Sequence, residues 1–438
     1  MLLNKRNRIM KKILTIIFCL FVTHAFGQQQ ISGKVTDEKG SPLVNASVFI
    51  AESKNGTMTD TSGHFKLTLQ AKGNFKIVVS YIGYKTTARA LNTSSISSNI
   101  DFVLTPVSHQ LKDVIVTSKA SNNWKRWGAM FTEQFIGTSA FAAHCTITNP
   151  EVIGFDYDDA KQELHAYASE PLIIRNEDLG YLVSLTLVDF TFYTSKNEVD
   201  YQGYYLFKEI DGNERRKATW EQNRLKAYSL SFMHFTRALY NDKLKEEGFE
   251  VRQFSAGNIR EKERIEKLYA QKLNTYLDSA KIEKNKLLDT NQIASKIFNK
   301  DSLRYYKKIL TNKSEIKMSE PLKAKDISAK SENNITLNFK DQLQVVYKKI
   351  KEPEEYYNYR NHAALTTEST TVQSTGISTS QLIMPTKQYP FTELLLEKGI
   401  PVEITENGYY NNTNLYLNGF WGWWEKMATK LPYDYEPN

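Results

Sequence analysis

The side chains that could carry nucleophilic chemistry in this chain are Cys145 and the histidines. His144 directly precedes Cys145, but adjacent residues on a strand or helix point in different directions, so the two cannot pair as base and nucleophile. His165 or His234 would have to supply the base from another part of the fold. The apolar stretch 140–143 favours a buried, inert thiol. We therefore predict no catalytic residue. If the chain has a catalytic site without a recognisable motif, its candidate residues are Cys145, His165 and His234.

Metal-dependent hydrolysis would need a recognisable set of ligands. A zinc carboxypeptidase site uses His-x-x-Glu together with a distant histidine. No histidine of this chain is followed three residues later by glutamate; the histidines are His24, His64, His109, His144, His165, His234 and His362. The acidic run 156–159 lacks the ligand spacing and glycine of an EF-hand loop, which favours a solvated turn. Phosphate-binding, dinucleotide-binding and Gly-x-Ser-x-Gly motifs are also missing from the sequence, so we predict no metal and no cofactor.

Aromatic residues gather close to the C-terminus, at Trp421, Trp423 and Trp424. Sugars pack flat against such rings, so this cluster is a candidate contact for a glycan or another partner. The alternative interpretation, which we favour, is that the rings anchor the C-terminal segment onto the core.

The N-terminus has the pattern of a secretory signal peptide. Basic residues precede an apolar run at 13–22, and Ala25-Phe26-Gly27 provides small residues for cleavage before Gln28. The run is too short for a spanning helix, and Met10 offers an alternative start. Residues 1–27 carry five of the 57 basic side chains and none of the 49 acidic ones, so the mature chain is close to neutral. Nucleic-acid binding is therefore not expected.

Residues 30–104 show the alternation typical of an antiparallel β-sandwich. Apolar residues recur at every second position, and turn residues separate the runs at 38–42 and 60–63. The alternating positions are Ile31, Val35, Phe65, Leu67, Leu69, Phe75, Ile77, Val79, Tyr81, Ile100, Phe102 and Leu104. We expect a seven-stranded or similar sandwich with its own core.

Three groups of residues in this region resemble the carboxypeptidase regulatory-like domain. They are Gly33-Lys34-Val35 with Asp37, Gly40 and Pro42-Leu43; Thr59-Asp60 with Gly63 and Phe65; and Tyr81-Ile82-Gly83-Tyr84. The resemblance implies a transthyretin-like (prealbumin-like) sandwich over 30–117, an accessory module that is generally non-catalytic. The segment 111–116 is similar to the one that follows this domain in TonB-linked outer-membrane receptors. Too few residues follow here for a receptor barrel, and the chain ends without the terminal aromatic residue of such barrels.

The remaining chain predicts an α+β region. A polar linker is expected at 118–123, followed by one α+β domain built from 124–252 and 334–438. Strands are predicted at 151–157, 163–168, 182–193 and 201–210, and a helix at 224–248. Parts of this region resemble uncharacterised exported proteins that carry the same N-terminal module, and that resemblance implies no activity.

A charged helical insertion is predicted at 257–330. Its single narrow apolar stripe indicates helices with one buried face. Basic residues outnumber acidic ones between 257 and 317. We expect a solvated helical face; the alternative is contact with anionic lipid headgroups, which would give peripheral membrane association, or with an acidic partner.

These observations favour an exported protein of a Gram-negative envelope, located in the periplasm or at the outer membrane. The accessory module and the lack of catalytic motifs predict a non-catalytic binding or assembly component, with an envelope protein or a glycan as partner. The alternative is an unrecognised hydrolase, directed at peptides or glycans, with its site in 124–438.

Overall fold

The structure is a computed structural model that describes residues 30–69, 74–92, 99–107, 118–195, 198–255, parts of 264–294, 296–311, 317–331, 333–361, 387–410 and 414–437. For the first residues of α2 (118–122) it describes the backbone. The predicted signal peptide, the segment 111–116 and part of the predicted insertion lie outside the described residues.

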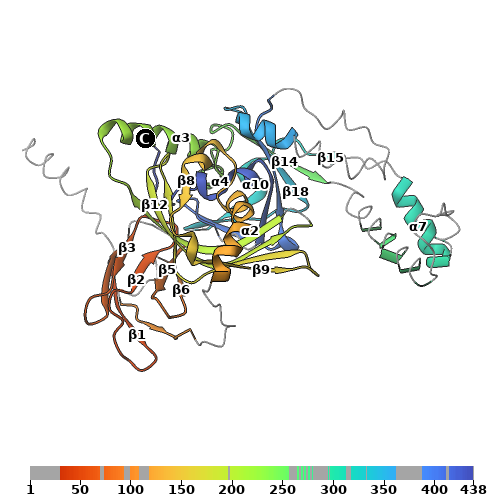
Figure 1. The fold of residues 1–438 in the computed structure, drawn as a ribbon. Coiled ribbons are helices and arrows are strands. Elements are labelled where there is room, and N and C mark those ends of the chain that lie inside the picture. Colours follow the sequence, from red (N-terminus) through yellow and green to blue (C-terminus); the bar gives the residue numbers. More distant parts are fainter. Residues whose placement is uncertain are drawn as a thin grey trace, which may run out of the picture. The chain divides into compact units, whose positions relative to one another are not determined.

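The N-terminal region is a sandwich of seven strands in two sheets (Figure 1). One sheet has the order β4-β1-β7, in which β1 is Gln30–Asp37, β4 is His64–Thr68 and β7 is Phe102–Leu104. The other has the order β3-β2-β5-β6, with β3 Gly56–Met58, β2 Ser47–Ile50, β5 Asn74–Ser80 and β6 Thr87–Asn92. The predicted β-sandwich is therefore confirmed.

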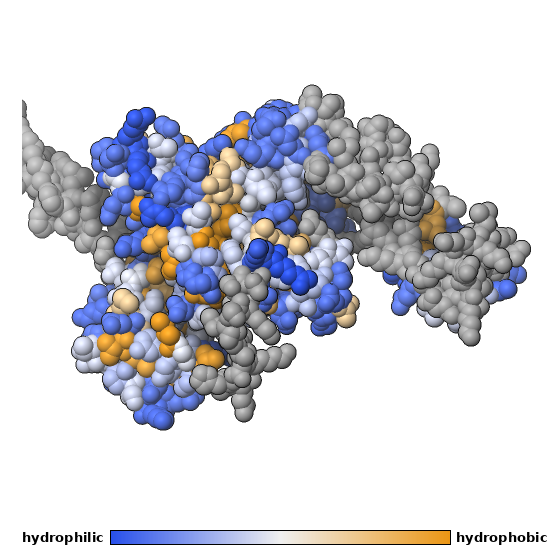
Figure 2. Space-filling model, in the orientation of Figure 1, coloured by the Kyte–Doolittle hydropathy of each residue, from blue (hydrophilic) through white to orange (hydrophobic). Residues whose placement is uncertain are grey.

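The core of the sandwich consists of the alternating apolar residues. Fifteen of its side chains form one buried cluster, in which Ile31, Val35 and Ile77 are fully buried. Burying one such side chain stabilises by about 1.5–3 kcal/mol. Other apolar side chains remain exposed on the sandwich, among them Met58 and Ile82. Figure 2 shows hydrophobic patches, in orange, on the sandwich at the lower left.

Local hydrogen bonds explain the turn between β3 and β4. Asp60 Oδ1 accepts from the backbone N–H of Ser62 and of His64, at 2.8 and 2.9 Å. Gly63 has a φ of 79°, and a Cβ there would lie 2.6 Å from the carbonyl oxygen of Val35. Glycine is therefore required at this turn both by its backbone angle and by the close approach of β1.

A six-stranded antiparallel sheet follows. Its order is β8-β11-β12-β10-β9, and β13 lies along the other edge of β12. The strands are β8 (Cys145–Ile147), β9 (Ile153–Asp158), β10 (Glu163–Ala168), β11 (Leu172–Asn176), β12 (Tyr181–Tyr193) and β13 (Glu198–Glu209). The predicted strands 163–168, 182–193 and 201–210 correspond to β10, β12 and β13. The predicted strand 151–157 begins instead with a 3-10 turn, Pro150–Val152, before β9.

Helix α2 (Ser118–Phe135) packs on this sheet, so the prediction of a linker at 118–123 is wrong. The contacts are aromatic: Phe131 lies 4.8 Å from Phe190 between ring centroids, and Trp124 lies 6.0 Å from Phe155. The polar residues that suggested a linker belong to the first turns of a helix whose apolar side begins at Trp124.

The predicted helix 224–248 is confirmed over 224–229 and 232–240, but it is neither continuous nor extended to Gly248. The chain forms α3 (Glu214–Ser229) and then α4 (Phe232–Tyr240). Asn213 starts α3 early because its side chain accepts a hydrogen bond from Arg216 N at 3.0 Å. Ser231 separates the helices, and its hydroxyl accepts from His234 N at the start of α4.

A second group of strands completes the α+β region. One sheet has the order β15-β14-β18-β19-β21 and another the order β16-β17-β20. The strands are β14 (Phe249–Ser255), β15 (Lys317–Met318), β16 (Ser328–Lys330), β17 (Asn334–Leu337), β18 (Gln342–Tyr347), β19 (Phe391–Leu396), β20 (Val402–Thr405) and β21 (Leu415–Gly419). The helices are α7 (Lys300–Thr311), α8 (Ala324–Ile327) and α10 (Phe420–Trp424).

Contacts divide the chain into two compact units. One contains 1–237, 405–409 and 424–438, and the other contains 238–404 and 410–423. This grouping differs from the predicted joining of 124–252 with 334–438. The sandwich and the six-stranded sheet fall into the same unit because backbone hydrogen bonds join them: Glu52 N donates to Tyr205 O, and Phe207 N donates to Ser53 O.

We predict that residues 28–120 expressed alone fold into the sandwich. Its main core lies between its own two sheets, and a small apolar cluster around Phe49 and Val78 packs against Tyr204 and Leu206 of β13. A two-dimensional NMR spectrum should show dispersed amide resonances. A spectrum typical of a disordered chain would contradict this prediction.

Candidate functional site

Cys145 is buried at the start of β8, at one edge of the six-stranded sheet. It pairs with Asn176 of β11. Burial, assisted by the negative charge of Asp178, raises the pKa of its thiol to about 12. A thiol nucleophile has to be ionised near neutral pH, so Cys145 is placed as an inert core residue.

His144 is the last residue of the 3-10 helix Ala140–His144, and it faces solvent whereas Cys145 is buried. The side chain of His144 is exposed, and its Nδ1 lies 3.0 Å from Oδ2 of Asp178. A carboxylate on Nδ1 orients an imidazole as a base whose Nε2 faces outward. Sequence reasoning missed this pair because the two residues are separated by 34 positions and no motif links them.

The two other candidate histidines are held by different partners. His165 lies on β10, with Nδ1 3.0 Å from Thr191 Oγ1 and Nε2 3.4 Å from Glu163. His234 is buried in α4, where its Nδ1 lies 3.1 Å from Ser229 O. Strands β11 and β10 pair with opposite ends of the same edge of β12, and β8 lies on the far side of β11. The structure therefore does not bring Cys145, His165 and His234 together as a catalytic group.

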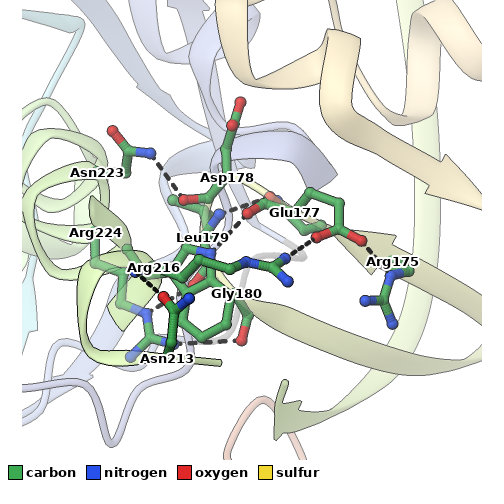
Figure 3. A network of polar contacts seen from close by, with 11 residues as sticks. Arg175, Glu177, Asp178, Leu179, Gly180, Asn213, Arg216, Asn223 and Arg224 are labelled. Carbon is green, nitrogen blue, oxygen red and sulfur yellow. Dashed lines mark hydrogen bonds and ion pairs between the residues drawn. The ribbon is translucent and has the colours of Figure 1, made fainter. Parts of the chain in front are cut away.

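Helix α3 holds the turn between β11 and β12 by donating to four successive carbonyl groups (Figure 3). The pairs are Trp220 Nε1 to Glu177 O (2.8 Å), Asn223 Nδ2 to Asp178 O (2.9 Å), Arg224 Nε to Leu179 O (2.7 Å) and Arg224 Nη2 to Gly180 O (3.4 Å). The three donors are three and four residues apart, which places them on one face of the helix. Their spacing is the signal that could have identified this role.

Charged side chains surround the same turn. The Glu177 carboxylate accepts from Arg175 and, at 2.5 Å, from Arg216 (Figure 3). The hydrogen bond from Arg175, followed by the charges of both arginines, holds the pKa of Glu177 below its usual value. The guanidinium of Arg224 lies 4.0 Å from the ring centre of Tyr181. The ion pairs of Glu177 and the backbone contacts of Arg224 hold the turn in place, so we describe this cluster as a structural clamp.

The described residues complete no catalytic constellation at this clamp. His144 and Asp178 supply a base, but acyl transfer also needs a nucleophile within hydrogen-bond reach. Within the part of the chain that the structure describes, Nε2 of His144 has no hydrogen-bond partner, and no three His, Cys, Asp or Glu side chains gather as a metal site. None of the described helices is long and apolar enough to cross a membrane.

The C-terminal tryptophans are buried, so they present no open ring face for a sugar. Trp421, Trp423 and Trp424 are 3%, 6% and 2% exposed. Trp423 lies 5.1 Å from Tyr356 between ring centroids, whereas Trp424 packs 6.1 Å from Phe141 and its Nε1 donates to the carbonyl of Ala227. Their burial corrects the glycan-contact hypothesis, because the rings pack in the core.

We predict that native Cys145 resists alkylation. With a pKa of about 12, the thiol stays protonated at pH 8 and burial blocks the reagent. Iodoacetamide at pH 8 should label the native protein far more slowly than the protein in denaturant, as followed by mass spectrometry. Equal labelling rates would show an accessible thiolate and would revive the nucleophile hypothesis.

Residues 31–116 match the CarboxypepD_reg-like domain family. The chain therefore carries this domain, as the sequence resemblance implied. A TonB-dependent receptor from Formosa agariphila is 32% identical over 105 residues, which are 24% of this chain and 10% of the receptor. The TonB-dependent receptor SusC from Bacteroides thetaiotaomicron is 39% identical over 85 residues, 19% of this chain and 8% of the receptor. The chain thus spans about a tenth of the length of these curated relatives.

Among solved structures, 3-chlorocatechol 1,2-dioxygenase from Rhodococcus opacus matches at 13% identity with a TM-score of 0.15. The match covers 18% of this chain and 59% of that chain. A similarity of this extent carries no argument about function.

Proposed function

We propose that this protein is a non-catalytic binding or assembly component of the bacterial cell envelope. The observation that carries the proposal is the CarboxypepD_reg-like domain at 31–116, a domain that TonB-dependent receptors of the envelope also carry. In this chain the domain accompanies an α+β region instead of making up the whole protein. We infer that its partner is an envelope protein or a glycan of the periplasm or outer membrane.

The way the sandwich is attached supports a role in holding a partner at a fixed position. Residues 52–54 of the sandwich pair with β13 and also hold the C-terminal segment: Tyr433 N donates to Glu52 O at 2.8 Å, and Lys54 N donates to Asp434 Oδ2 at 3.0 Å. Lys430 Nζ lies 3.3 Å from the Glu52 carboxylate. A module that is held at several points presents its surface in one orientation, which lowers the entropic cost of binding.

We predict that the turn 81–84 contributes to partner binding. Ile82 is 74% exposed, so its side chain contributes little to the fold and is free to be buried by another molecule. Ile82→Asp should reduce the partner recovered by affinity purification from envelope extracts by about tenfold, since burying a charge in an apolar contact is costly. Thermal unfolding should be unchanged.

The matched control is Leu225→Asp. Leu225 is 43% exposed on α3, and the same change of chemistry there should leave recovery unchanged. Equal recovery with wild type and Ile82→Asp would remove this turn from the binding surface. Recovery of neither protein nor glycan with the wild type would count against the proposed function itself.

The hydrolase alternative has one specific observation in its favour, the His144–Asp178 pair. Peptide- or glycan-hydrolysing activity that is lost in His144→Ala and retained in His165→Ala would establish it. Lack of hydrolysis by the purified full chain would leave the binding role as the function.

A further inference from the structure

Among the described residues, one edge of strand β13 is only partly paired. The strand pairs with β12 along its whole length. On its other side, the backbone hydrogen bonds among the described residues are confined to the C-terminal end, where Tyr205 O accepts from Glu52 N at 2.7 Å and Phe207 N donates to Ser53 O at 2.9 Å. Residues 198–204 continue the same strand without a described backbone partner on that side.

The alternation of the backbone identifies which groups face this edge. Because Tyr205 and Phe207 bond outward, every second residue before them also directs its N–H and C=O away from β12. These residues are Val199, Tyr201 and Gly203. Proline and lysine, two common devices that block an edge, do not occur in 198–204. The N-terminal half of β13, next to the part that pairs with Glu52 and Ser53, therefore presents outward N–H and C=O groups that have no backbone partner among the described residues.

The sheet face beside this edge is acidic. Paired residues share one face of a sheet, and the register places Asp156, His165, Thr191 and Asp200 in one row and Asp158, Glu163, Tyr193 and Glu198 in the next. Asp189 lies beside Gln202 at a bulge. Glu198 and Asp200, the carboxylates nearest the edge, have no ion pair among the described residues, and both are exposed.

This charge distribution indicates which kind of segment could bind at the edge of β13. A strand added to β13 would project every second side chain over Glu198 and Asp200, at a strand spacing of about 4.8 Å. Lysine or arginine at those positions would be attracted, whereas a second copy of this edge would bring carboxylates together and be repelled. We propose that residues 198–204 dock an extended, basic segment of a partner protein, which joins the six-stranded sheet as a further strand. This deepens the proposed function and rests on it, because it names the kind of partner.

The experiment uses the mature full chain and fluorescein-labelled peptides of six repeats, with fluorescence anisotropy as the readout. A Lys-Thr repeat can pair as a strand and place its lysines on one face. A Lys-Pro repeat carries the same charge but lacks alternate N–H groups, so it cannot form the ladder. A Glu-Thr repeat can pair but has the wrong charge. We expect the Lys-Thr peptide to bind at least about tenfold more tightly than either of the others.

Variants of the chain test separately the contribution of the β13 backbone edge and that of the negative charge beside it. Val199→Pro removes an N–H that faces outward and leaves the bonds to β12, so it should weaken binding by about tenfold or more. Glu198→Gln with Asp200→Asn should also weaken binding and reduce its dependence on salt. The control Glu170→Gln removes an exposed carboxylate that has no described partner and lies beyond the other end of β10, and it should bind like the wild type.

The outcomes are distinct. Equal affinity for the Lys-Thr and Lys-Pro peptides would overturn strand addition, because charge alone would then explain binding. Wild-type affinity of a folded Val199→Pro would also overturn it, and the peptide comparison decides the matter if that variant does not fold. Lack of binding by the Lys-Thr peptide, while envelope extracts still yield a partner, would overturn this inference and leave the proposed function standing.

Discussion

Replacing Arg224 with methionine is expected to lower the free energy of unfolding by about 1–3 kcal/mol. The guanidinium donates to the carbonyl group of Leu179, which would become a buried acceptor without a described donor. The carbonyl group of Gly180, its other acceptor, keeps a hydrogen bond from Ile210 N at 3.0 Å. Its ion pair with Glu209 adds little, since that carboxylate is half-exposed. Denaturant unfolding followed by tryptophan fluorescence measures the change.

Arg216→Met is the matched control on the same helix. Arg216 pairs with Glu177 at 2.5 Å, but both side chains are more than one-third exposed, so the loss should stay below about 1 kcal/mol. A loss for Arg224→Met no larger than that for Arg216→Met would show that the carbonyl groups of the turn are satisfied in another way, and that α3 does not clamp it.

Phe131→Ala should be more severe, with a loss of about 3–5 kcal/mol. Phe131 is fully buried and its ring contacts Trp124, Phe135, Phe155 and Phe190. Truncation would leave a cavity between α2 and the six-stranded sheet that these large rings cannot fill without moving. The same unfolding measurement applies.

The exposed residue Lys125 of α2 provides the comparison, and Lys125→Ala should change stability by less than about 0.5 kcal/mol. If Phe131→Ala were as mild as Lys125→Ala, α2 would not be part of the core, and the predicted linker would have to be reconsidered.

The sandwich could be predicted from sequence because its signals are local. Period-two runs such as Phe75, Ile77 and Val79 are read directly, and the turn chemistry of Asp60 and Gly63 depends only on neighbouring residues. The strands β10, β12 and β13 could be predicted from the sequence for the same reason.

Other elements could not be predicted, because contacts between residues far apart in the sequence determine them. Asn213 caps the start of α3. The hydrogen bonds from α3 to the carbonyl groups of 177–180 cannot be predicted locally, because the two segments are far apart in the sequence. The His144–Asp178 pair depends on β8 lying beside β11. From the sequence, the tryptophans near the C-terminus could form either a binding surface or part of the core. Their burial in the structure shows that they belong to the core.

The proposed role is tested most directly by purifying the protein, at its natural abundance, from fractionated cells after mild crosslinking. Mass spectrometry would identify the mature N-terminus and the molecules bound to it. We predict a chain that begins after residue 27, located in the periplasmic or outer-membrane fraction and bound to a defined envelope protein or glycan. A cytosolic chain that retains residues 1–27, or an envelope chain bound to neither protein nor glycan, would contradict the account.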